Sequence, residues 1–201
     1  MKDQRPENPS EQIQMIRSMV EATKYNLYKD RFLYFMWGYM TLACAGLHYI
    51  LGYILRVEHP YMVWGAMGIA GLVHVLYLRK RKNEARVRTY MDRVMAGIWG
   101  GLSLSIFAVL LGSPQLAWTA MYPFMMILYG VACYASGTAL GFRVLLFGGL
   151  GSILCGVIAF YQPFQHQLLL LMLAVLFSYI IPAHSMAPAA NKGGKTPALH
   201  S

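Results

Sequence analysis

The sequence predicts an all-α, polytopic membrane protein with six transmembrane helices preceded by a cytoplasmic amphipathic helix. Three observations predict this fold class. Hydrophobic residues make up 57% of the 201 residues and charged residues only 12%, whereas soluble domains carry about 25% charged residues. The charges are clustered, and the apolar blocks between the clusters are long enough to cross a bilayer. Lysine and arginine gather on alternate connections, as the positive-inside rule requires.

Residues 1–31 are polar and mixed in charge, which predicts a cytoplasmic segment rather than a cleaved signal peptide. Asn8 as N-cap, Pro9 at the first helical position and Glu11 together predict a helix start. An apolar stripe then recurs at three- and four-residue steps, through Ile13, Ile16, Val20, Thr23 and Leu27. We expect this apolar stripe to be buried against another surface. The inner membrane surface, the protein's own loops, another protein and a second copy are the alternatives.

The predicted transmembrane bundle covers residues 32–183. Its six blocks are 32–55, 61–78, 94–112, 116–136, 144–161 and 167–183. Each holds about 17 to 25 residues, enough for a hydrocarbon layer of about 30 Å at about 1.5 Å per residue. Residues 184–201 are predicted to form a flexible cytoplasmic tail.

Two features predict how these helices pack. Small residues at four-residue steps favour close helix approach, and we expect a compact bundle around Gly65, Gly68, Gly71, Gly97, Gly101, Gly137, Gly141, Gly148, Gly149, Ser152 and Gly156. Pro123 lies inside the fourth block and predicts a kink. The carbonyl that it leaves free needs a partner from a neighbouring helix or from water.

The basic residues predict the orientation. A cluster follows the second block: Arg79, Lys80, Arg81, Lys82, Arg86 and Arg88. Together with the N-terminal lysines and arginines it predicts that both termini are cytoplasmic. The formal charge of +9 does not indicate a nucleic acid partner, because the basic run is adjacent to a span and has no nucleic-acid-binding fold around it. Anionic lipid headgroups are the predicted partner.

No aspartate or glutamate follows Asp92, which excludes most carboxylate chemistry from the later spans. His48 and His74 are predicted at different depths, so they do not make a haem site. We expect no metal site and no cofactor, although Glu58, His59 and His48 leave a transition-metal site open as an alternative. Cys44, Cys133 and Cys155 are interpreted as small packing residues.

Two stretches resemble a group of small six-span inner-membrane proteins of bacteria, mostly of the Bacteroidetes type. One is residues 32–51, FLYFMWGYMTLACAGLHYIL, and the other is residues 129–149, YGVACYASGTALGFRVLLFGG. The resemblance implies this architecture and a bacterial inner membrane, and it implies no activity or catalytic residue.

These observations predict a non-enzymatic integral membrane protein that regulates or binds a partner through its cytoplasmic basic face. Lipid, a cytoplasmic protein or a second copy of the chain would contact this face, which includes Ile13, Ile16, Val20 and Leu27. The alternative is a small-solute transporter or channel whose polar path contains His48, Tyr122, Pro123, Tyr129, Tyr134 and Ser136. An intramembrane hydrolase that uses Ser136 also stays open, although the sequence around it lacks the first glycine of a GxSG motif.

Overall fold

The computed structural model describes residues 9–29, 31–82 and 90–186, and in this part of the chain it contains helices and no strand. The prediction of an all-α fold is confirmed. The predicted N-cap Asn8, the basic residues Arg86 and Arg88, and the tail beyond residue 186 lie outside the described residues. The elements are α1 Pro9–Lys29, α2 Arg31–Tyr49, η1 Ile50–Ile54, η2 Pro60–Gly65, α3 Ala66–Lys82, α4 Tyr90–Gly112, η3 Ser113–Gln115, α5 Trp118–Leu140, α6 Arg143–Ala159, α7 Phe164–Val175, η4 Leu176–Ile180 and α8 Ile181–Ser185.

Four helical segments of the described residues are long and apolar enough to cross a membrane. They are Pro60–Lys80, Tyr90–Gln115, Trp118–Leu140 and Phe164–Ser185, and they match the second, third, fourth and sixth predicted spans within a few residues. The fifth predicted span corresponds to α6, which is apolar but has only 17 residues. The first corresponds to α2 and its π-helical extension η1. The chain is therefore a helical membrane protein.

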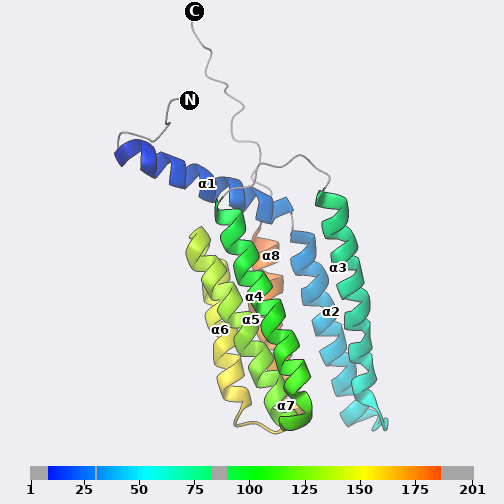
Figure 1. The fold of residues 1–201 in the computed structure, drawn as a ribbon. Coiled ribbons are helices and arrows are strands. Elements are labelled where there is room, and N and C mark those ends of the chain that lie inside the picture. The colour runs from blue at the N-terminus through cyan, green and yellow to red at the C-terminus, as the bar shows by residue number, and fades with distance from the viewer. Residues whose placement is uncertain (1–8, 30, 83–89, 187–201) are drawn as a thin grey trace, which may run out of the picture.

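The helices α2 to α6 and the continuous α7–η4–α8 segment lie side by side and alternate in direction, whereas α1 lies across one end of the bundle (Figure 1). At this end α2, α4 and α6 begin, and α3, α5 and α8 end. We call it the basic end, because exposed cationic residues gather there: Arg31, Arg79, Lys80, Arg93 and Arg143. Arg56 lies at the far end, in the connection between α2 and α3.

The core lies among α2, α5, α6 and the α7–η4–α8 segment. Its fully buried side chains include Met126 of α5, Leu145 of α6 and Leu171 of α7. α5 and α6 approach each other closely, because a Cβ added at Gly130 would lie 2.7 Å from the carbonyl oxygen of Gly149. α6 and η4 are also close, because a Cβ added at Gly148 would lie against the carbonyl oxygen of Phe177. Of the predicted glycines on and after α5, Gly137, Gly148, Gly149 and Gly156 bring helices together in this way, whereas a Cβ added at Gly141 would meet nothing within 4 Å.

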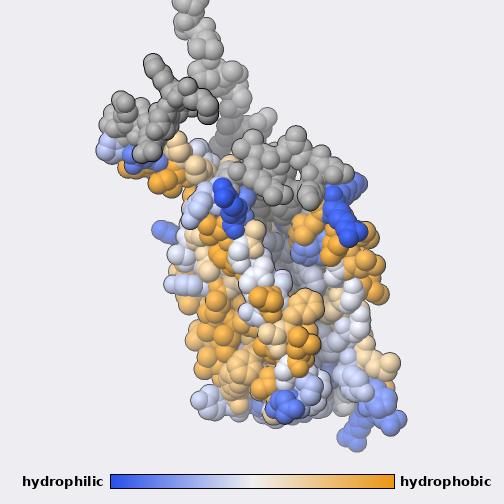
Figure 2. All heavy atoms as spheres, viewed as in Figure 1, coloured by the Kyte–Doolittle hydropathy of each residue, from blue (hydrophilic) through white to orange (hydrophobic). Residues whose placement is uncertain are grey.

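The glycines of α3 and α4 do not have this role. A Cβ added at Gly65, Gly68, Gly71, Gly97 or Gly101 would meet nothing within 4 Å. The expectation that these residues pack tightly within the chain is wrong, because α3 and α4 lie on the outside of the bundle and leave these positions open. Figure 2 shows the resulting apolar surface over the middle of the visible face, with hydrophilic residues gathered towards both ends.

Candidate functional site

An aromatic and polar cluster joins four elements near the far end of the bundle. His48 of α2 is buried, and its Nδ1 accepts a hydrogen bond of 2.9 Å from Trp64 Nε1 of η2. The Tyr122 hydroxyl of α5 lies 3.1 Å from the same Nδ1, and the Phe164 ring of α7 packs on the rings of His48 and Tyr122. Because an indole N–H can only donate, Nδ1 is the unprotonated nitrogen of His48. We call these four residues the far cluster.

A second tryptophan–histidine pair joins the same two spans near the basic end. Trp37 Nε1 of α2 donates to His74 Nδ1 of α3 over 2.8 Å. Each span thus provides one tryptophan near its start and one histidine near its end, and the two antiparallel spans exchange hydrogen bonds at both ends. Trp37 and Trp64 have equivalent roles, whereas Trp99 packs on Tyr34 and Tyr179 instead.

A second aromatic cluster lies closer to the basic end. It contains Tyr34 of α2, Trp99 of α4, Tyr129 of α5 and Tyr179 of η4, with neighbouring ring centroids 5.5 to 6.2 Å apart. The Tyr34 hydroxyl is buried and has no hydrogen-bond partner in the part of the chain that the structure describes. Since the rings come from four different elements, this cluster acts as a central contact of the bundle.

Pro123 breaks the hydrogen-bond ladder of α5, and Gln167 of α7 completes it. A proline has no N–H, so the carbonyl of Thr119, four residues earlier, loses its helical partner. Gln167 Nε2 donates to this carbonyl over 2.8 Å. It also lies 3.1 Å from the carbonyl oxygens of Ala159, the last residue of α6, and of Gln162 in the connection that follows. Gln167 is almost fully buried. One side chain thus connects α5, the end of α6 and α7, and the partner that the sequence required is identified.

The reverse relationship between the same two helical segments is found near Pro182. This proline has no N–H and stands where the chain passes from the five-residue steps of η4, in which Ile181 bonds the Leu176 carbonyl, to the four-residue steps of α8. Cys133 of α5 donates to the Ser178 carbonyl of η4 with a Sγ–O distance of 3.3 Å. The free carbonyl on α5 is therefore met by a side chain of α7, and a carbonyl on η4 is met by a side chain of α5.

The six residues of the predicted polar path do not converge. His48 and Tyr122 meet in the far cluster, and Tyr129 lies in the other aromatic cluster. Pro123 is buried, whereas Tyr134 is 41% exposed and faces away from the core. Ser136 is fully buried, and its hydroxyl has no partner among the described residues.

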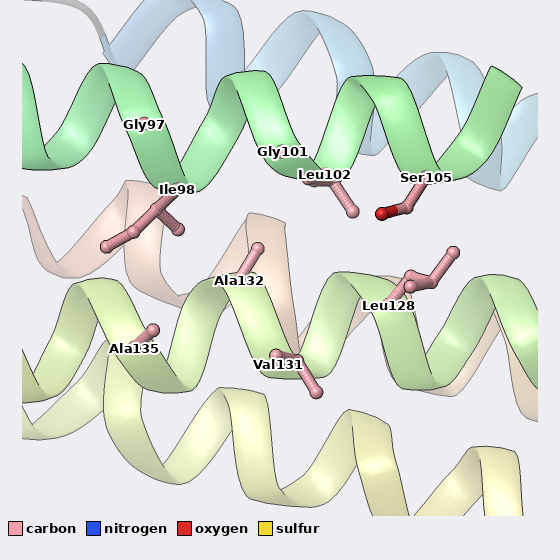
Figure 3. Close-up of a pocket in the computed structure, with 9 residues that line it drawn as sticks. All are labelled: Gly97, Ile98, Gly101, Leu102, Ser105, Leu128, Val131, Ala132 and Ala135. Atoms are coloured by element: carbon pink, nitrogen blue, oxygen red, sulfur yellow. The ribbon is translucent and has the colours of Figure 1, made fainter. Parts of the chain in front are cut away.

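The grooves found on the bundle lie elsewhere. One of about 290 Å³ separates α4 from α5 and is lined by Gly97, Gly101 and Ser105 on one side and by Leu128, Ala132 and Ala135 on the other (Figure 3). A second of about 420 Å³ lies over α6 and η4, beside Phe147 and Phe177. Both are shallow and mainly apolar, and none of the six path residues lines either of them.

The predicted partner or lipid face divides into two parts. Ile13 and Ile16 of α1 are 61% and 57% exposed, and Val20 is half-buried. Arg79 and Lys80 are exposed at the end of α3. Arg81 and Lys82 continue this helix, but their side chains and that of Leu27 lie outside the described ones. These residues all belong to elements at the basic end of the bundle (Figure 1).

Glu58, His59 and His48 do not form a metal-binding group, because the described residues contain no group of three or more histidine, cysteine, aspartate or glutamate side chains that could hold an ion. His59 Nδ1 instead lies 3.3 Å from the Tyr61 hydroxyl.

Gln167 and the two tryptophan–histidine pairs were not recognised as important from the sequence. Two features of the sequence together could have identified Gln167. It is a glutamine at the start of an apolar block, and a proline in another block leaves a carbonyl free. No family model, curated protein or solved structure matches this chain.

Proposed function

We propose that this chain is a non-enzymatic component of the bacterial inner membrane that regulates or binds a partner through its cytoplasmic basic face. In this proposal the basic end is cytoplasmic and both termini lie on that side. The four long apolar segments, α2 with η1, and α6 make six spans. The segment Arg31–Ile54 supports the first of these, because its two helical pieces together reach about 36 Å at about 1.5 Å per residue.

The proposal is supported mainly by the hydrogen bonds that the buried polar groups of the bundle make with other helices. Gln167, Cys133 and Ser152 all donate to backbone carbonyls of other helices, and His48 Nδ1 accepts from Trp64. These groups hold helices together, so they are not available to a solute or a reaction. The exposed cationic residues that define the basic end lie outside the core, where a partner or anionic headgroups can contact them.

The test is a crosslinking experiment in membranes. Deletion of residues 1–30 removes Tyr28 from the edge of the core but no residue of the apolar segments, so we expect normal membrane insertion and the loss of crosslinks to any cytoplasmic partner. Replacement of Arg79 and Lys80 with glutamine weakens the same crosslinks, whereas Arg56→Gln at the far end leaves them unchanged. Crosslinks that persist unaltered after the deletion contradict the proposal.

A transporter or channel is the second candidate, and irregular backbone supports it. The π-helical segments η1 and η4 and the residue Pro123 interrupt helices that pack in the bundle, and such irregularities are frequent at functional sites. Tyr34 Oη, Ser136 Oγ and Gln167 Oε1 are buried without a partner in the described part of the chain. Solute flux into proteoliposomes tests this candidate, and flux equal to that of empty vesicles eliminates it.

A further inference from the structure

The N-terminal half of α1 extends beyond the bundle while keeping one face directed towards it. α1 lies across the basic end of the other helices (Figure 1). Its C-terminal half is anchored, because Thr23 is only 3% exposed and Tyr28 packs against the core. Ile16 lies two helical turns before Thr23 and therefore shares its face, yet Ile16 is 57% exposed.

This geometry decides where the apolar stripe points. Thr23 faces the end of the bundle, and Ile16 and Ile13 lie on the same side of the helix. Because they lie beyond the edge of the bundle, none of its helices lies beneath them. For a bundle that spans a membrane, this side faces the bilayer. Figure 2 shows hydrophobic residues on the side of α1 that faces the bundle.

The charges of α1 are arranged in agreement with this direction. At 100° per residue, Arg17 and Lys24 lie beside the apolar stripe, at its edge, whereas Glu21 lies farther round the helix. Arg17 and Glu21 are both exposed. Cations at the edge of an apolar stripe can extend to lipid phosphates while their methylene groups stay in the apolar layer.

We infer that residues 9–20 form an in-plane anchor, with Ile13 and Ile16 inserted at the boundary between headgroups and acyl chains and Arg17 bound to anionic headgroups. The occupant of the stripe is thus the lipid surface and not a protein. The inference rests on the proposed function only in placing α1 on the cytoplasmic side of a membrane-spanning bundle. It leaves partner binding to the basic residues at the end of α3 and to the opposite face of α1.

The test uses the full chain in phosphatidylcholine vesicles with and without phosphatidylglycerol. A nitroxide is attached at Ile16→Cys or at the matched control Ser18→Cys, which is also exposed and lies about 200° away around the helix. The unsubstituted chain, whose three cysteines are buried, gives the background. We expect a several-fold higher ratio of oxygen to water-soluble nickel collisions at position 16 than at position 18, and a further rise at position 16 with phosphatidylglycerol.

Two substitutions that each change the charge by one unit test the cation. With the label at position 16, Arg17→Gln removes the rise caused by phosphatidylglycerol, and Ser18→Glu does not. Equal nickel access at positions 16 and 18 overturns the inference, since the stripe then faces water. Protection of position 16 from both oxygen and nickel also overturns it, since a protein or a second copy then covers the stripe.

The two proposals fail separately. A label in lipid combined with unchanged crosslinks after deletion of residues 1–30 supports the anchor and contradicts the proposed function. A label in water combined with lost crosslinks does the reverse.

Discussion

Gln167 Nε2 lies 2.8 Å from the carbonyl oxygen of Thr119, the carbonyl that Pro123 deprives of its helical hydrogen bond. The donor belongs to α7 and the proline to α5. The carbonyl that lacks a helical partner and the side chain that bonds to it therefore lie at the same depth. In a bilayer an unpaired carbonyl has no water to bind. This contact therefore fixes the rotation and height of α7 against α5.

The first prediction concerns this contact. Gln167→Leu leaves the Thr119 carbonyl unpaired and is expected to lower the free energy of unfolding by about 1–3 kcal/mol. Pro123→Ala restores the N–H within α5, so the same leucine substitution costs less in that background. Unfolding in mixed micelles measures both values and their coupling.

Gln115→Leu is the control for this cycle, because Gln115 is exposed beyond the end of α4. It is expected to change the unfolding free energy by less than about 0.5 kcal/mol. Equal costs of Gln167→Leu with and without Pro123 show that the two residues are not coupled.

The second prediction concerns Cys133, whose thiol donates to the Ser178 carbonyl. Cys133→Ala removes the donor and is expected to cost about 1 kcal/mol, whereas Cys133→Ser keeps a donor of similar size and costs less. Cys155 is also buried, but no hydrogen bond from its side chain to another helix is seen in the described residues. Serine at position 155 is therefore expected to be more harmful than alanine, the opposite order, and the same order at both positions contradicts this interpretation.

The third prediction concerns the two tryptophan–histidine pairs. Substitution of Trp64 by phenylalanine removes the indole donor to His48, and Trp37→Phe removes the donor to His74. Double-mutant cycles should give a coupling of about 0.5–1.5 kcal/mol within each pair. The crossed cycles, Trp64 with His74 and Trp37 with His48, provide the control and should be additive, because those residues lie at opposite ends of the two spans.

The fourth prediction compares glycines. Gly130→Ala forces a methyl group against Ile153 and the Gly149 carbonyl, at 2.6 and 2.7 Å, and is expected to destabilise the bundle by about 1–3 kcal/mol. Gly97→Ala on α4 meets nothing within 4 Å and is expected to be neutral or slightly stabilising. Thermal unfolding of monomeric protein measures both. A large loss at position 97 means that α4 packs against something that this chain does not provide.

The sequence determined the helical class, the position of the apolar segments and the shared end of the basic residues. Each of these depends on local properties, since the cost of transferring a residue into hydrocarbon accumulates along one segment. Gly141 was expected to bring helices together and instead ends α5 with a left-handed φ of 61°.

Only the tertiary structure decided which glycines pack, which polar residues meet and which donor reaches each free carbonyl. Gly97 and Gly130 look alike in the sequence, yet Gly97 lines the open groove beside α5 and Gly130 contacts α6. The reason is that lipid and helix interiors are equally apolar, so hydrophobicity does not set the rotation of one span against another. That rotation follows from backbone contact and a few hydrogen bonds, such as Gln167 to Thr119, which form only when all the helices are in place.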